Sequence, residues 1–202
     1  MENKMARFFS LLFHPLLIST YFFVLTHHLP FHFSMIIPQQ SKWMIIGLVF
    51  ITTFAVPALL ISIFSFGMKK LTKPDEREER YLPLAIAIIF NFLAYYLLNK
   101  VQLSPIFNLF NLGVTSLLVI CLLITLAWKI SIFMAGAGAF FGALLGLAIT
   151  LDINITYILL LSILVSGAIG FSRMLSKKHS PAQVYGGFLL GAATMFLHYL
   201  YF

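Results

Sequence analysis

A short stretch near the end of the chain combines residue types that bind and attack a phosphate group. Ser172 and Arg173 stand together, and His179 follows the arginine by six residues. A guanidinium binds phosphate oxygens through paired hydrogen bonds, and a histidine ring can act as a nucleophile. Gln183 stands four residues after the histidine, where a carboxylate would hold the ring in one tautomer and support its charge. The spacing predicts a histidine-based phosphate site with an amide in place of that carboxylate.

The same stretch also has structural interpretations. Ser180-Pro181-Ala182-Gln183 has the pattern of a capping box, with serine at the N-cap, proline at the first helical position and glutamine at the third. In that case Gln183 closes a helix start, which is compatible with a site beside it. Chance occurrence of the Ser-Arg-x5-His pattern in a basic loop is a further alternative.

Two earlier segments could supply groups to the same site. The charged run from Lys73 to Arg80 offers point charges and guanidinium groups, and Ser131 opens an apolar stretch whose first backbone N–H groups could bind an anion. The charged run is otherwise a solvated loop with internal ion pairs, or contacts a lipid headgroup through Arg77. A metal site on its acidic residues would need a second acidic loop, which the sequence lacks, so neither a metal nor another cofactor is expected.

Together, these two segments and the Ser172–Gly191 stretch resemble the type 2 phosphatidic acid phosphatase (PAP2) superfamily, the membrane lipid phosphatases related to vanadium haloperoxidases. That family carries the motifs K-x6-R-P, P-S-G-H and S-R-x5-H-x3-D, the last followed by a helix that contains glycine. Ser172, Arg173 and His179 match the third motif, and Gly187 and Gly191 fit its helix. The resemblance covers the order of the motifs and about the last two-thirds of the chain.

The first two motifs match less fully. Lys73 and Arg80 match the first, with Tyr81 in place of the proline, and only Ser131 matches the second. Phe133 stands where that motif has its histidine. By the resemblance, His179 and Gln183 form the catalytic pair, with His179 forming a phosphohistidine intermediate. The phosphate-binding residues that the resemblance implies are Lys73, Arg80, Ser131, Ser172 and Arg173.

Two departures leave the function open. Phe133 cannot protonate a leaving group, a contribution of about 10²–10⁴-fold in enzymes that have such an acid. Gln183 brings no charge, and the equivalent loss in serine proteases costs about 10⁴-fold. The chain is therefore either a phosphatase acting on a lipid phosphate or prenyl diphosphate, or a degenerate protein that binds lipid phosphate for transport, scaffolding or regulation. An unrelated multi-pass transporter is the third alternative.

Composition places any such site in a membrane. The chain is 61% hydrophobic and 9% charged, against about 25% charged residues in soluble domains. We therefore expect residues 1–202 to form one membrane-embedded, all-α, PAP2-like bundle. Although the net charge is +7, the basic residues lie in short loops between apolar stretches, so the expected partner is a membrane lipid or prenyl phosphate and not nucleic acid.

Apolar stretches of about 20 residues suffice to cross a bilayer, and the sequence contains seven candidates. We expect six or seven spans. The first follows Lys4 and Arg7; it is long for the apolar region of a signal peptide and no cleavage site follows it, so it is expected to be retained. The stretches are 8–27, 43–67, 82–98, 106–127, 130–150, 156–171 and 183–201, with the loop 172–182 carrying the third motif.

Seven crossings place the N-terminus and all three motif segments on one face of the membrane. Eleven of the 13 lysines and arginines fall on that face, so the positive-inside rule makes it cytoplasmic. The expected location is the cytoplasmic membrane, with the motif loops inside the cell.

Other polar residues in apolar surroundings have a functional and a structural interpretation. His14 precedes Pro15 in the first stretch, and could replace the missing acid or form a local hydrogen bond at a kink. His27, His28 and His32 could bind zinc or lie at the membrane interface. Glycines at intervals of four predict closely packed helices, and three asparagines within apolar stretches predict hydrogen bonds between helices. These residues are Gly138, Gly142 and Gly146, and Asn91, Asn108 and Asn111.

Overall fold

The computed structural model describes residues 13–29, 37–68, 80–101 and 105–201. Within these ranges every regular element is a helix, which confirms the all-α prediction. The chain forms two compact units, which are considered separately. Unit 1 contains the described parts of 1–18 and 123–202, and unit 2 those of 19–122.

Unit 2 contains a long helical run with a wide π-helical turn in its middle. Pro57 has no backbone N–H to donate, and the turn Ile51–Ala55 stands just before it. The hydroxyl groups of Thr52 and Thr53 bond back to carbonyl groups of the preceding turn, which also favours a local bend. The helices are α2 (Ile18–His28), α4 (Gln39–Phe50), α5 (Val56–Met68), α6 (Tyr81–Lys100) and α7 (Pro105–Ala127), of which residues 18 and 123–127 belong to unit 1.

Buried asparagines connect the helices of unit 2. Ser19 donates its hydroxyl proton to Asn91 Oδ1 at 3.2 Å, which joins α2 to α6. Asn108 donates to Asn99 Oδ1 at 3.4 Å, which joins α7 to α6. The predicted interhelical bonds are thus confirmed for these two asparagines, whereas the Asn111 side chain has no hydrogen-bond partner among the described residues.

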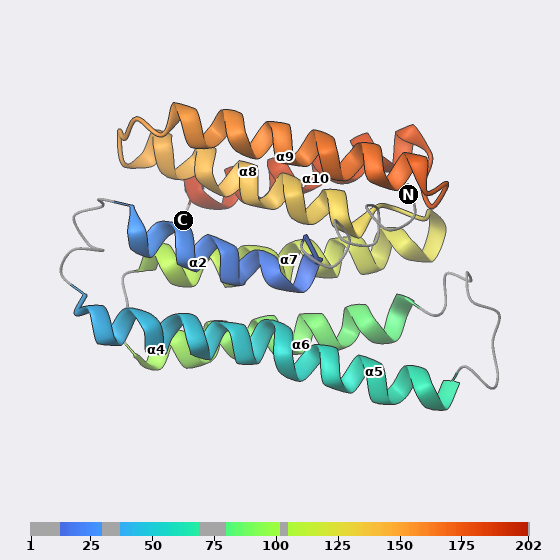
Figure 1. Ribbon diagram of the computed structural model, residues 1–202, viewed down its shortest axis with the longest axis horizontal. Helices are drawn as coiled ribbons and strands as arrows, with labels where there is room; N and C mark the ends of the chain where they lie inside the picture. Colours follow the sequence, from blue (N-terminus) through green and yellow to red (C-terminus); the bar gives the residue numbers. More distant parts are fainter. Residues whose placement is uncertain (1–12, 30–36, 69–79, 102–104, 202) are drawn as a thin grey trace. The chain divides into compact units, whose positions relative to one another are not determined.

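Unit 1 consists of three long helices side by side and a short segment before them (Figure 1). α8 and α10 contact each other through their backbones, because a Cβ at Gly138 would collide with Phe188 O and one at Gly191 with Ala135 O. This confirms the predicted packing role of the glycines. The elements are η1 (Pro15–Leu17), α8 (Ile132–Thr150), α9 (Thr156–Leu175) and α10 (Pro181–Tyr201).

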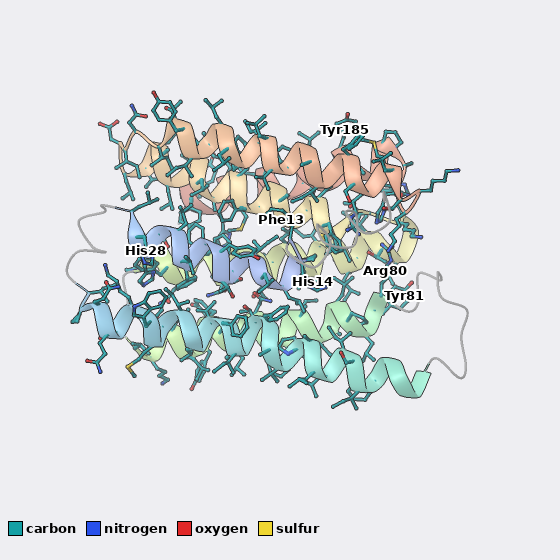
Figure 2. All side chains as sticks on the ribbon, viewed as in Figure 1. Phe13, His14, His28, Arg80, Tyr81 and Tyr185 are labelled. Carbon is teal, nitrogen blue, oxygen red and sulfur yellow. The ribbon has the colours of Figure 1, made fainter. Side chains whose placement is uncertain are left out.

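The segment before α2 packs on α8. Phe13 contacts a buried cluster that contains Met134 from α8 and Ile169 from α9. A Cβ at Gly136 would overlap the Ile18 side chain, so this part of the segment lies directly on α8. These contacts hold His14, labelled in Figure 2 beside Phe13, within unit 1.

The helices agree with a multi-pass membrane protein. Five helical runs of the described residues are long and apolar enough to cross a bilayer. One expected boundary is wrong: the sixth stretch continues to Leu175, so Ser172 and Arg173 lie in the last turn of α9 and not in a loop. The five runs are Gln39–Phe64, Tyr81–Lys100, Pro105–Ala127, Ile132–Thr150 and Thr156–Leu175.

Candidate functional site

The first residues between Arg173 and His179 form the end of α9. The Lys177 N–H donates to Met174 O at 2.9 Å, and the Lys178 N–H donates to Arg173 O at 3.3 Å. Together with the left-handed backbone of Lys177, at a φ of 50°, these bonds form a Schellman motif. The motif ends the helix within one turn of Arg173 and redirects the chain toward α10.

The residues directly after His179 form the start of α10. Ser180 Oγ accepts a hydrogen bond from the Gln183 N–H at 3.4 Å, and Gln183 Oε1 accepts one from the Ser180 N–H at 3.1 Å. With Pro181 as the first helical residue, this is the predicted capping box. A helix C-cap followed at once by an N-cap therefore separates the arginine from the histidine, and His179 stands directly before the capping serine.

The capping box also determines how His179 is held. The ring nitrogen Nδ1 of His179 lies 3.1 Å from Gln183 Oε1. Because Oε1 accepts from the Ser180 N–H, the oxygen of the amide is the atom that faces His179. The Nδ1 atom must therefore carry the proton in the neutral ring, which leaves the lone pair on Nε2. Gln183 orients the ring as a carboxylate would, without contributing a charge.

Arg173 lies beneath an aromatic ring from the segment that matches the second motif. Its side chain is buried, with 4% of its surface exposed, and its guanidinium carbon lies 3.9 Å from the centroid of the Phe133 ring. A guanidinium over a ring face gains a cation–π interaction. Phe133 thus supports the arginine through its ring face, a role that its place along the sequence does not indicate.

His14 joins this pair from the other end of the chain. Its ring meets the Phe133 ring edge-on, with 5.7 Å between centroids. It lies close enough to Arg173 for the two side chains to interact electrostatically. Nδ1 of His14 accepts a hydrogen bond from the Leu16 N–H at 3.3 Å, so the local bond that the sequence suggested is present. His14 contacts the candidate site as well as capping η1.

Two serines add hydroxyl groups near these segments. Ser131 is the N-cap residue of α8, and its N–H donates to Gln183 O at 3.3 Å, which joins the start of α8 to the start of α10. Ser131 and Ser172 are both buried. Neither hydroxyl has a hydrogen-bond partner within the described ranges, so both have capacity to bond a ligand.

The first-motif residues are not among the described residues of unit 1. Lys73 lies outside the described residues, and Arg80 belongs to unit 2, directly before Tyr81 at the start of α6 (Figure 2). The expected meeting of Lys73 and Arg80 with Arg173 and His179 stays a prediction. Unit 1 brings together the second and third motif segments and His14.

The proposed zinc ligands have other bonds. His27 Nδ1 lies 2.8 Å from Phe23 O and His28 Nδ1 lies 2.7 Å from Val24 O, each a bond to the preceding turn of α2. His32 lies outside the described residues. In the part of the chain that the structure describes, no three histidine, cysteine, aspartate or glutamate side chains are grouped to hold a metal.

Comparison of the chain with protein-family models, with curated proteins and with solved structures finds no match.

Proposed function

We propose that this chain is a PAP2-like membrane protein with six or seven spans that hydrolyses a lipid phosphate or prenyl diphosphate through His179. The observation that carries the proposal is the hydrogen bond between His179 Nδ1 and Gln183 Oε1, held in one direction by the capping box. It leaves the lone pair on Nε2, the atom that must attack phosphorus.

The proposed reaction has two displacements. In the first, the Nε2 lone pair of His179 forms a bond to phosphorus while the bond from phosphorus to the leaving oxygen breaks, which gives a phosphohistidine. The leaving group departs as the lipid monophosphate or, from a lipid phosphate, as an alkoxide that takes a proton from water. In the second, water attacks phosphorus and the bond to Nε2 breaks, which releases phosphate and restores the ring. Arg173 neutralises the phosphate oxygens through its guanidinium group.

The missing acid favours a substrate with a stable leaving group. Phe133 stands where a histidine would protonate the departing oxygen, and a phenyl ring has no proton to give. A phosphate leaves without protonation more readily than an alkoxide does. We therefore infer that a prenyl diphosphate is turned over faster than a phosphatidate.

A second function is favoured by the contact between Phe133 and Arg173. An apolar ring that fixes the arginine builds a binding site whether or not chemistry follows. In that case the chain binds a lipid phosphate without hydrolysing it, and the site serves transport, scaffolding or regulation.

Phosphate release from purified protein in detergent separates the two functions. Phosphatidate and undecaprenyl diphosphate are the substrates, His179→Ala the test variant and His28→Ala, an exposed histidine of unit 2, the matched control. Release that is lost in His179→Ala and kept in His28→Ala supports the hydrolase. No release, with lipid-phosphate binding that weakens in Arg173→Ala, supports the binding protein. Neither release nor Arg173-dependent binding would contradict both.

We also propose that the turn between α9 and α10 faces the cytoplasm in the cytoplasmic membrane, because eleven of the 13 lysines and arginines fall on that side in a seven-span topology. A cysteine placed at the exposed Lys177 should react with a membrane-impermeant thiol reagent in inside-out vesicles and not in intact cells. The buried Cys121 should stay unlabelled in both. The opposite pattern would reverse the orientation.

A further inference from the structure

The segment that carries His14 is part of the candidate site by its packing. Phe13 and Ile18 both contact the helices of unit 1, and His14 between them meets Phe133 edge-on. Phe133 in turn covers the guanidinium of Arg173 at 3.9 Å. The N-cap residue of η1 therefore meets side chains from α8 and α9, although His14 is more than a hundred residues from both Phe133 and Arg173 in sequence.

The hydrogen bond at the start of η1 decides which nitrogen of His14 carries the proton. The Leu16 N–H donates to Nδ1, so Nδ1 acts as the acceptor. A neutral imidazole with an accepting Nδ1 carries its proton on Nε2. The neutral ring of His14 therefore carries its proton on Nε2, and a nitrogen that accepts from the backbone is poorly suited to hold the second proton that a general acid would need.

We propose that His14 is a phosphate-binding residue, which donates its Nε2–H to the phosphate group held by Arg173. The inference rests on the proposed phosphate site and names a residue of that site outside the three motifs. His14 does not replace the missing acid; it adds a neutral donor beside a cation. A terminal phosphate has enough acceptor oxygens for both the Nε2–H of His14 and the guanidinium of Arg173. We therefore expect the ligand to be a lipid that ends in a phosphate group.

Two substitutions separate binding from helix capping. Asparagine is a preferred N-cap residue and can accept the Leu16 N–H, yet it is too short to place a donor where Nε2 lies. Glutamine places an amide N–H near the Nε2 position but is a poor cap. His14→Asn should therefore weaken phosphate binding and keep stability, and His14→Gln should keep binding and lower stability. If His14 serves only as a helix cap, His14→Gln should weaken phosphate binding more than His14→Asn does.

Binding is measured on the full chain in detergent by isothermal titration calorimetry, and stability by thermal unfolding without ligand. The probes are inorganic phosphate and a non-hydrolysable short-chain lipid phosphonate, with a phosphatidylcholine of equal chain length as the negative control. His14→Asn should weaken binding by about 10- to 100-fold, as expected for losing a hydrogen bond to a charged group. His28→Asn should bind as the unaltered protein does.

The outcomes are distinct. Weaker binding of both probes by His14→Asn supports a contact with the phosphate group itself, and weaker binding of the lipid probe alone supports a contact made only with the lipid-borne headgroup. Unchanged binding in His14→Asn, with Arg173→Ala still disruptive, overturns the role of His14 and leaves the proposed function standing. No binding of either probe by the unaltered protein overturns both.

Discussion

The Nδ1 atom of His179 lies 3.1 Å from the Oε1 atom of Gln183, an oxygen that also accepts the Ser180 N–H. One amide thus caps α10 and orients the ring. Because of this dual role, substitutions of Gln183 should change both stability and activity. The shape and the charge of the side chain at this position can be varied one at a time.

Gln183→Glu keeps the shape and adds the charge. A glutamate at the third helical position retains the capping box and interacts well with the helix dipole, so stability should rise by about 0.3–1 kcal/mol. It should also support the charge on His179, and phosphate release should increase about tenfold or more. An aspartate is one methylene shorter and should raise release less. The measurements are thermal unfolding and the rate of phosphate release.

Gln183→Leu is the matched control with similar size and no acceptor. It should lower stability by about 1 kcal/mol, as expected for a lost cap interaction, and reduce phosphate release. Release that is unchanged in Gln183→Leu would show that the bond to His179 has no catalytic role.

Phe133→His introduces a ring that can donate a proton. The new ring can still stack on Arg173, and a general acid is worth about 10²–10⁴-fold when the leaving group needs protonation. Hydrolysis of phosphatidate should therefore increase more than hydrolysis of undecaprenyl diphosphate. The ratio of the two kcat values measures this effect, and Phe133→Leu, which has neither stacking nor a proton, should accelerate neither. An equal increase on both substrates would count against the missing-acid explanation.

Gly191→Ala should destabilise unit 1. The new methyl group would collide with the carbonyl oxygen of Ala135, and overpacking of this kind costs about 1–3 kcal/mol. Gly167→Ala on α9 is the matched control, because a Cβ there meets nothing within 4 Å. Thermal unfolding in detergent should show a lower midpoint for Gly191→Ala only. Equal midpoints would mean that α8 and α10 can separate without loss of stability.

Lys177→Gly tests the turn between the two halves of the site. Lys177 has a φ of 50°, a left-handed conformation that costs an L-residue about 1 kcal/mol relative to glycine. The glycine variant should be more stable by about that amount, with phosphate release unchanged. Lower stability would indicate that the Lys177 side chain contributes more than its backbone conformation costs.

Composition and short sequence patterns are enough to predict the membrane class and the helix cap at the start of α10. The membrane class follows from 61% hydrophobic residues, and the capping box follows from four adjacent residues. Both depend on interactions within one helix or between the chain and its solvent, so no long-range packing had to be known. The hydropathy pattern places the end of α9 too early, because Ser172 and Arg173 are polar and the apolar stretch stops before them. The backbone hydrogen bonds of the helix continue to Leu175.

Tertiary packing decided which distant residues meet in unit 1. The stacking of Phe133 on Arg173 and the contact of His14 with Phe133 join three helical segments, and no spacing along the chain specifies such contacts. They arise because Phe13 and Ile18 bury apolar surface on α8, and because glycines let α8 and α10 touch. The sequence by itself could name the arginine and the histidines; only the packed helices determine that His14 stands beside the ring that covers Arg173.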